Sequence, residues 1–145
     1  MDLHIATPQD NLQAICAQMQ PGKWGADNEM TSYQPDELKA YLESDNTLLL
    51  LAKDGDKIAG AALCYILPHP ARQGSLYAHE VDTHPDYRRQ GVATQMMREL
   101  QKIAKERGLT EVWLSTESTN AAANGFYRSL NPTETEPSVV YAYEV

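Results

Sequence analysis

The stretch LYAHEVDTHPDYRRQGVATQMMRELQKI, residues 76–103, decides the fold because it joins a core strand, a loop and a long amphipathic helix. Residues 76–83 are rich in apolar and aromatic side chains and predict a strand, although Glu80 and Asp82 interrupt it. Beyond Gly91, apolar residues recur at steps of three and four, which predicts a helix; these residues are Val92, Met96, Leu100 and Ile103. The sequence therefore predicts a strand, a loop and a helix in this order at the centre of the chain.

Shorter elements are predicted on both sides of this centre. Before it we expect a strand at 3–6, a helix from Thr7–Pro8 to Pro21–Gly22, a loop over 22–33, a helix from Pro35 to Ser44, and strands at 48–52 and 57–67 joined by a turn at Asp54–Gly55. After it we expect a strand at 111–115, a helix at 120–130 and a last strand at 139–145, with Tyr141 and Tyr143 packed on the sheet. This order predicts a mixed α/β (α+β) fold with a mostly antiparallel central sheet flanked by helices.

Length and charge limit the possible functions. The 145 residues suffice for one domain with a real core, and no repeat or linker divides them, so we expect a single domain over residues 1–145. The net charge of -8 disfavours nucleic acid and anionic lipid and favours cationic partners. The longest apolar run, residues 58–67, is too short to span a bilayer. Because the start of the chain lacks the pattern of a signal peptide, we expect a cytoplasmic protein that does not bind membranes.

The cysteines and histidines give no sign of a metal centre. Cys16 and Cys64 are too few for a disulfide framework or a metal site, and we expect both to be structural. The four histidines have no pairing that resembles a zinc site; they are His4, His69, His79 and His84. We therefore expect no metal.

The loop before the long helix reads Arg88-Arg89-Gln90-Gly91-Val92-Ala93-Thr94 and is called the phosphate loop below. A glycine at the start of a helix lets a ligand approach the backbone, and the unpaired N–H groups there bind phosphate. Two arginines add charge-assisted donors. On these residues alone, a solvated helix entry is an equally good interpretation. The loop is neither a P-loop nor a dinucleotide-binding fingerprint, because it lacks Gly-Lys-Ser/Thr and the three spaced glycines.

Residues 81–94 resemble the acyl-CoA signature of the GNAT superfamily of N-acetyltransferases. The pattern Arg/Gln-x-x-Gly-x-Gly/Ala of that family is matched by Arg88, Gly91 and Ala93. A second family segment, Asn-x-x-Ala-x-x-Phe/Leu-Tyr, is matched downstream by Asn120, Ala123, Phe126 and Tyr127. The resemblance extends from the second predicted helix to Leu130 and implies the GNAT-type fold, with acetyl-CoA as co-substrate.

The resemblance also implies roles for individual residues. The backbone of Val81 and Thr83 would pair with the pantetheine arm of acetyl-CoA. The N–H groups from Arg89 to Thr94 would hold the pyrophosphate, which places all of Arg88, Arg89, Gln90, Gly91, Val92, Ala93 and Thr94 in the cofactor-binding set. Asn120 and Ala123 would face the cofactor. Tyr127 would protonate the departing thiolate, a role that suits a phenol with a pKa of ~10.

The other half of the reaction needs an amine without its extra proton, because an ammonium has no lone pair with which to attack. Glu80 on the core strand is the preferred base, acting directly or through one water, and His79 is the next candidate. An N–H group near Val81 can polarise the thioester carbonyl. Asp82 nominally shares a strand face with Glu80 and can anchor a second amine, unless a β-bulge changes its facing.

Acidic residues outside the core strand are further candidates for the acceptor site. Glu117 can add negative charge where an amine docks. Trp24, Asp27 and Glu29 form either one wall of the acceptor cleft or a plain surface loop.

Within the superfamily, the segments Tyr33–Asp36, Tyr65–Pro68 and the phosphate loop resemble those of aminoglycoside 3-N-acetyltransferases in content and order. Glu80 stands where those enzymes carry aspartate, and Asp82 where they carry a small apolar residue. The resemblance implies direct acetyl transfer, in a ternary complex, to a primary amine of a small cationic acceptor such as an aminoglycoside, hence antibiotic resistance, and a homodimer. A polyamine, an amino acid or a protein amine is the alternative acceptor, and a non-catalytic acyl-CoA-binding module is the alternative class.

Overall fold

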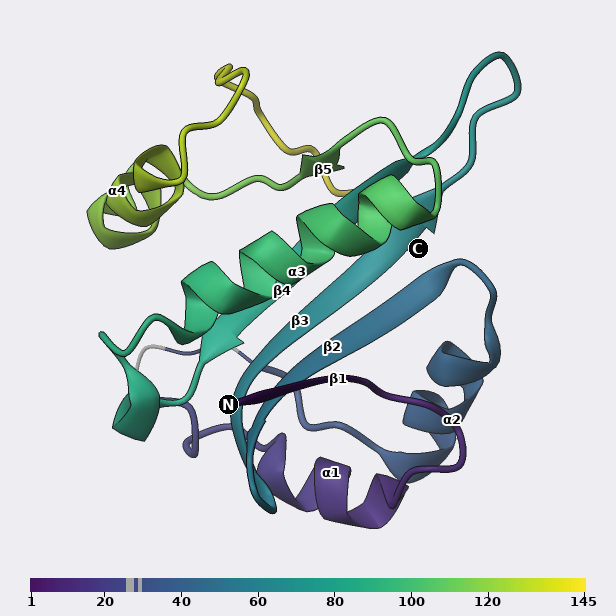
Figure 1. Ribbon diagram of the computed structural model, residues 1–145, viewed down its shortest axis with the longest axis vertical. Coiled ribbons are helices and arrows are strands. Elements are labelled where there is room, and N and C mark those ends of the chain that lie inside the picture. The colour runs from purple at the N-terminus through teal and green to yellow at the C-terminus, as the bar shows by residue number, and fades with distance from the viewer. Residues whose placement is uncertain (26–27, 29) are drawn as a thin grey trace. The chain divides into compact units, whose positions relative to one another are not determined.

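The computed structural model describes residues 1–25, 28 and 30–145, which form two compact units, residues 1–114 and 115–145. The first unit contains a five-stranded sheet in the order β1-β2-β3-β4-β5 (Figure 1). The strands are β1 (Asp2–Ile5), β2 (Thr47–Asp54), β3 (Lys57–Leu67), β4 (Ser75–Thr83) and β5 (Val112–Trp113). Every neighbouring pair is antiparallel except β4 and β5, which are parallel. The predicted mixed fold with a mostly antiparallel sheet is confirmed.

Helices cover both faces of this sheet (Figure 1). They are α1 (Leu12–Gln18), α2 (Pro35–Glu43) and α3 (Val92–Glu106). Successive residues of a strand point to opposite faces. Gly60 of β3 faces α3, because a Cβ atom there would lie 2.8 Å from both Val92 and Met96. Ala61 faces the other way, into a cluster with residues of α1 and α2. Glycine at position 60 thus allows α3 to pack closely on the sheet.

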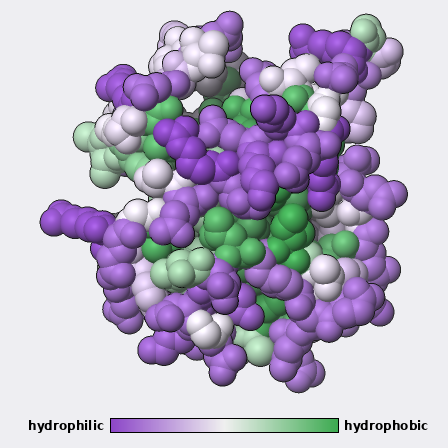
Figure 2. Space-filling model, in the orientation of Figure 1, coloured by the Kyte–Doolittle hydropathy of each residue, from purple (hydrophilic) through white to green (hydrophobic). Residues whose placement is uncertain are grey.

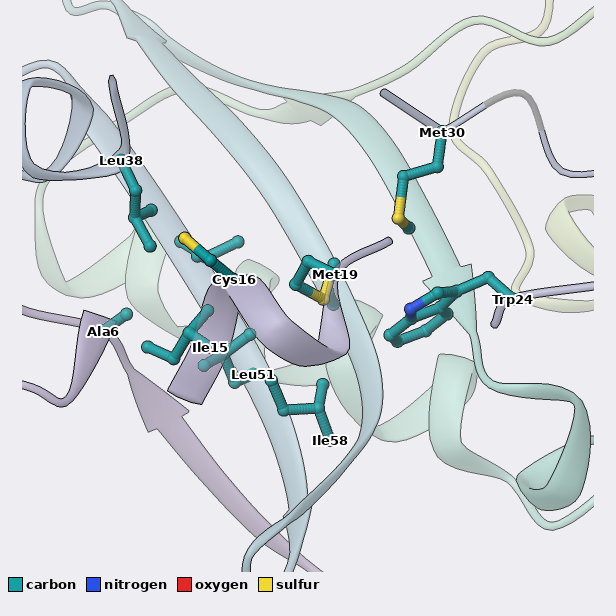
Figure 3. Packing of buried hydrophobic residues seen from close by; sticks show 11 residues of the cluster. Ala6, Ile15, Cys16, Met19, Trp24, Met30, Leu38, Leu51 and Ile58 are labelled. Carbon is teal, nitrogen blue, oxygen red and sulfur yellow. The ribbon is translucent and has the colours of Figure 1, made fainter. Parts of the chain in front are cut away.

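The continuous run of buried residues in β2 is explained by the helices that cover both faces of the sheet. Leu49 and Leu51 belong to the cluster on the α1 and α2 face, and Leu50 and Ala52, which point the opposite way, are also fully buried. A strand covered on both faces needs a continuous apolar sequence rather than an alternating one. Figure 3 shows the cluster on the α1 and α2 face, with Trp24 and Met30 at one end beside Met19.

Polar side chains lie outside this core. Among the described residues, none that is polar or charged is buried. The face of the molecule drawn in Figure 2 is mostly hydrophilic, with hydrophobic side chains gathered near its centre. In the part of the chain that the structure describes, no helix has the length and apolar character needed to cross a membrane. Cys16 and Cys64 are both buried and form no disulfide.

The first helix begins later than predicted. Residues 7–10 form a turn in which the Asp10 carboxylate accepts a hydrogen bond from the Thr7 N–H at 2.7 Å. The Asn11 side chain then accepts from the Ala14 N–H at 3.0 Å and caps α1. The predicted start at Thr7–Pro8 is wrong because Asn11 is the residue whose side chain caps the helix.

The second unit contains α4 (Ala121–Ser129), and its last residues do not form the predicted strand. The prediction of a strand at 139–145 is wrong, and so is the packing of its tyrosines, because Tyr141 and Tyr143 are 76% and 86% exposed. Residues of high β propensity need a neighbouring strand to satisfy their backbone groups. In the described part of residues 115–145 there is no such strand. The single domain over residues 1–145 stays a prediction.

Candidate active site

In the described chain, the outer edge of β4 is paired with another strand over two residues only. Its pairing with β5 is limited to Leu76 opposite Val112 and Tyr77 opposite Trp113. Beyond Tyr77, no strand in the described residues pairs with this edge. The second half of β4 is thus an edge strand, which can pair with an extended ligand.

The register of β3 and β4 shows which groups face this open edge. The His84 N–H donates to the Ala59 carbonyl at 2.8 Å, so these two residues form a hydrogen-bonded pair. Hydrogen-bonded and non-hydrogen-bonded pairs alternate along an antiparallel ladder. Thr83 and Val81, opposite Gly60 and Ala62, are therefore in non-hydrogen-bonded pairs, and their own N–H and C=O groups point away from β3.

The N-terminus of α3 has the backbone geometry expected of an anion site. Gly91 is its N-cap, with φ 79° and ψ 11° in the left-handed region, and no side chain caps the helix. Nothing lies within 4 Å of a Cβ atom placed on Gly91. The backbone at the start of this 15-residue helix is therefore open at Gly91, and the helix dipole together with the first N–H groups favours an anion there.

The side chains of the phosphate loop differ in what they contact. The Arg88 guanidinium donates to the Trp24 carbonyl at 3.3 Å, and the Gln90 amide donates to the Asp86 carbonyl at 3.2 Å. Arg89 is exposed and has a positive φ of 60°. Val92 is buried against the sheet, so only its backbone can meet a ligand, whereas Ala93 and Thr94 are half-buried.

Glu80 and Asp82 lie on one face of β4. The register shift that the sequence analysis allowed for is present, but it lies before them: Leu63 pairs with Glu80 and Cys64 pairs with Ala78, which leaves His79 as the extra residue of a β-bulge. From Glu80 onward the strand is regular, so Asp82 shares the face of Glu80. This is the face covered by α1 and α2, because Asp82 is paired with Ala61.

Tyr33 lies close enough to both carboxylates for their charges to act on it. Burial, and then the charges of Glu80 and Asp82, raise the pKa of the Tyr33 phenol. Tyr33 therefore stays a neutral hydrogen-bonding group beside the two carboxylates. No local sequence pattern indicates a role for Tyr33 beyond its place in the segment Tyr33–Asp36, which carries part of the resemblance.

His79 joins Glu80 to a group of aromatic rings. Its Nδ1 atom lies 2.9 Å from the Tyr77 hydroxyl, and its Nε2 atom lies 4.0 Å from Glu80 Oε1. The His79 ring packs edge-on against Tyr65, with 5.9 Å between ring centroids. Tyr77 stacks on Trp113 at 4.3 Å. The bulge thus places an imidazole between a carboxylate and a phenol at the surface of the sheet.

Trp24 is not a wall of an acceptor cleft. Its side chain is fully buried, and its indole N–H donates to the Gln18 carbonyl at 2.9 Å. A large apolar ring contributes more to stability in the core than at the surface. Both predictions for Trp24, the wall of an acceptor cleft and a plain surface loop, are therefore wrong. Asp27 and Glu29 lie outside the described residues.

In the second unit, the predicted cofactor-facing residues form the start of α4. The Asn120 side chain accepts from the Ala123 N–H at 3.0 Å and caps the helix. The Glu117 carbonyl accepts from the Asn120 N–H at 3.0 Å, and the Glu117 side chain is exposed. Tyr127 is half-buried and packs edge-on against Phe126, with 5.0 Å between centroids.

Comparison with known proteins identifies the family. The sequence profile of the acetyltransferase (GNAT) family matches residues 13–131. The chain belongs to this family. It is 34% identical over 80 residues to N-alpha-acetyltransferase 30 of Schizosaccharomyces pombe, and 26% identical over 106 residues to human N-acetyltransferase 8B. These matches cover 55% and 72% of the chain but only 53% and 47% of the relatives, so the chain spans about half the length of the curated relatives it matches.

Solved structures share the GNAT fold. An aminoglycoside acetyltransferase from an uncultured soil metagenomic sample, in complex with sisomicin, has a TM-score of 0.88 at 19% identity, with 99% of this chain and 95% of that chain covered. The aminoglycoside N-acetyltransferase AAC(6')-Iy, in complex with CoA, has a TM-score of 0.75 at 19% identity, with 99% and 95% covered. At this identity the likeness shows the fold alone.

Most of the predicted site residues of this GNAT chain belong to the first unit. The open backbone of β4, the phosphate loop and the carboxylates Glu80 and Asp82 all belong to residues 1–114, whereas Glu117, Asn120, Ala123 and Tyr127 belong to residues 115–145. Within the described residues, no group of three or more His, Cys, Asp or Glu side chains could hold a metal ion.

Asp82 carries a cost in stability that its substitution should remove. Burial raises the pKa of Asp82, and the hydrogen bond from Asn28, with 3.0 Å between Asn28 Nδ2 and Asp82 Oδ1, only partly opposes this. The folded chain therefore binds the proton more tightly than the unfolded chain, and stability decreases as pH rises from the ordinary pKa of 3.8 through the raised one. We expect Asp82→Asn to raise Tm slightly at pH 7.

The control for this prediction is the same comparison of Tm values at a series of pH values. The difference in Tm between Asp82→Asn and the wild type should disappear below the ordinary pKa of 3.8, where both side chains are neutral. Thermal unfolding followed by circular dichroism measures it. A Tm at pH 7 lower than that of the wild type would show that the charged form of Asp82 stabilises the fold.

Proposed function

We propose that the chain is an acetyl-CoA-dependent N-acetyltransferase whose acceptor is a small cationic amine, with aminoglycosides as the preferred class. One observation carries the proposal: helix α3 begins at Gly91 with no side-chain cap, and shortly before it in the sequence lies the strand edge of β4 that is paired over two residues only. The chain that has this arrangement belongs to the GNAT family. Bound acetyl-CoA supplies the acetyl thioester.

The residues present fit acetyl-CoA. A Cβ atom at Gly91 would meet nothing within 4 Å, so the backbone is open to a phosphate group. The outward N–H and C=O groups of Val81 and Thr83 suit the amides of a pantetheine arm. We assign the pyrophosphate to the N–H groups from Arg89 to Thr94. Asn120 and Ala123 are assigned to the cofactor on the family motif.

Two side chains are proposed to move protons. The Glu80 carboxylate accepts a proton from the acceptor amine, directly or through a water, and His79 beside it is the alternative base. The neutral amine nitrogen then forms the bond to the acetyl carbon, the bond from this carbon to sulfur breaks, and the Tyr127 phenol gives its proton to the sulfur. The second proton that the nitrogen sheds on becoming an amide returns through solvent to the Tyr127 phenolate, and Glu80 releases its proton to solvent. We assign to an N–H group near Val81 the stabilisation of negative charge on the acetyl oxygen.

The cysteines support direct transfer without an acyl-enzyme. Cys64 is fully buried, and burial raises the pKa of its thiol to about 12. Burial also raises the pKa of Cys16. A buried thiol with a raised pKa is a poor nucleophile because the thiolate is the reactive form. Transfer in a ternary complex needs neither of them.

The acceptor class follows from charge. Glu80 and Asp82 share one face of β4, so an acceptor with two ammonium groups can meet both carboxylates. The net charge of -8 also favours a polycation. The similar folds of aminoglycoside acetyltransferases support this class. A protein N-terminal amine is the second candidate, favoured by the 34% identity to N-alpha-acetyltransferase 30.

An acceptor panel tests the proposal. Thiol release from acetyl-CoA would be measured with aminoglycosides including sisomicin, with spermidine, with amino acids and with a peptide that has a free N-terminus. We expect kcat/KM for the best aminoglycoside to exceed that for the peptide by about 100-fold, equivalent to ~2.7 kcal/mol of transition-state binding. NMR of the product identifies the acetylated amine. Turnover of spermidine or the peptide but of no aminoglycoside would refute the proposal that aminoglycosides are the acceptors. The absence of both CoA binding and turnover would refute the proposed N-acetyltransferase activity.

A further inference from the structure

The Arg88 side chain connects two parts of the candidate active site. Its Nη2 atom donates to the Trp24 carbonyl at 3.3 Å. The next residue leaves room for this contact, since a Cβ atom on Gly25 would lie 2.9 Å from Arg88 Nη2. Gly25 also has a φ of +106°, a conformation that favours glycine. The backbone at Trp24 and Gly25 is thus fitted to the Arg88 guanidinium.

Trp24 is anchored to the core and to the loop that leaves β4. It is fully buried, and its ring meets the His84 ring edge-on, with 5.4 Å between centroids. His84 caps the short 3-10 helix Pro85–Tyr87 by accepting the Asp86 N–H at 3.2 Å. Arg88 and His84 therefore attach Trp24 to the loop between β4 and α3 at two points.

The chain after Trp24 leads to the carboxylate proposed for the acceptor. Asn28 Nδ2 donates to Asp82 Oδ1 at 3.0 Å, and Asn28 Oδ1 accepts the Met30 N–H at 2.7 Å. The Asn28 N–H in turn donates to the Gly25 carbonyl at 3.2 Å. Hydrogen bonds thus connect Arg88 of the phosphate loop to Asp82 through Trp24, Gly25 and Asn28.

We propose that Arg88 is a positioning residue for the amine acceptor: by binding the Trp24 carbonyl, it holds Asn28 against Asp82. This inference rests on the proposed N-acetyltransferase activity. It gives Arg88 a different role from the cofactor contact that the family motif implies, because the guanidinium is directed at the protein backbone. Acceptor binding then depends on a residue of the phosphate loop.

Substitution of Arg88 and of its neighbour Arg89 separates a role in acceptor binding from a role in CoA binding. CoA affinity would be measured by isothermal titration calorimetry, and the acceptor KM by thiol release with the best acceptor of the panel. We expect Arg88→Ala to raise the acceptor KM about tenfold while the Kd of CoA changes less than about threefold. The matched variant Arg89→Ala should weaken CoA binding and leave the acceptor KM nearly unchanged. A weaker CoA complex with a normal acceptor KM in Arg88→Ala would overturn the proposal.

A second variant tests the contact without removing the charge. Gly25→Ala displaces the guanidinium, so it should reproduce the acceptor effect of Arg88→Ala, and the double variant should add little to either. Amide exchange followed by NMR provides a readout that needs no acceptor: Asn28 and Met30 should exchange about tenfold faster in both variants, with the α3 amides unchanged. Unchanged exchange at Asn28 and Met30 would refute the proposal that Arg88 holds Asn28 against Asp82. Failure of the wild type to bind CoA would instead contradict the proposed function.

Discussion

Replacement of Gly91 by valine should weaken CoA binding by about 100-fold or more, equivalent to at least ~2.7 kcal/mol. Gly91 has a φ of +79°, where a β-branched residue is strongly disfavoured, so the backbone of the variant must leave the left-handed region. The N–H groups at the start of α3 would then no longer converge on one anion. Isothermal titration calorimetry with CoA measures the loss.

A second glycine serves as the matched control. Gly22 has a φ of +83° and, like Gly91, has nothing within 4 Å of its Cβ position, but it lies outside the phosphate loop. Gly22→Val should therefore lower Tm by a similar amount and leave CoA affinity unchanged. Tight CoA binding by Gly91→Val, or an equal loss of binding in both variants, would contradict a phosphate site at the start of α3.

The sequence could predict those parts of the fold that are determined by local patterns. The apolar steps of three and four predicted α3, which the structure has at Val92–Glu106. The Asp54–Gly55 pair predicted the turn between β2 and β3, where Gly55 has a φ of +58°. These features depend on neighbouring residues only.

Features that depend on distant partners could not be predicted in the same way. Residues 139–145 have the composition of a strand, but composition does not supply the neighbouring strand that a β-strand needs. Trp24 lies in an aperiodic segment, and nothing local shows that its indole would reach the Gln18 carbonyl in the core. The direction of the Arg88 side chain likewise depends on Trp24, 64 residues earlier in the chain.

Replacement of Tyr127 by phenylalanine should lower kcat by about 100-fold, within the range of general acid catalysis, with the Kd of CoA unchanged within about threefold. The variant keeps the ring, so the edge-on packing against Phe126, with 5.0 Å between centroids, should persist. The phenolic hydroxyl is lost, and with it the proton for the sulfur, so the thiol must then leave as an unprotonated thiolate. Steady-state kinetics of thiol release, together with calorimetric titration of CoA, separate the two effects.

The control is the same chemical change at an exposed tyrosine. Tyr141 is 76% exposed, and Tyr141→Phe should leave both kcat and the Kd of CoA unchanged. The pH profile adds a second criterion, because a catalytic acid loses its proton at high pH. The kcat of the wild type should therefore fall at high pH, whereas the kcat of Tyr127→Phe should not. Because Tyr127 and the base Glu80 belong to different units of the chain, normal turnover by Tyr127→Phe would remove the acid from the proposal while leaving the phosphate loop and Glu80 in place.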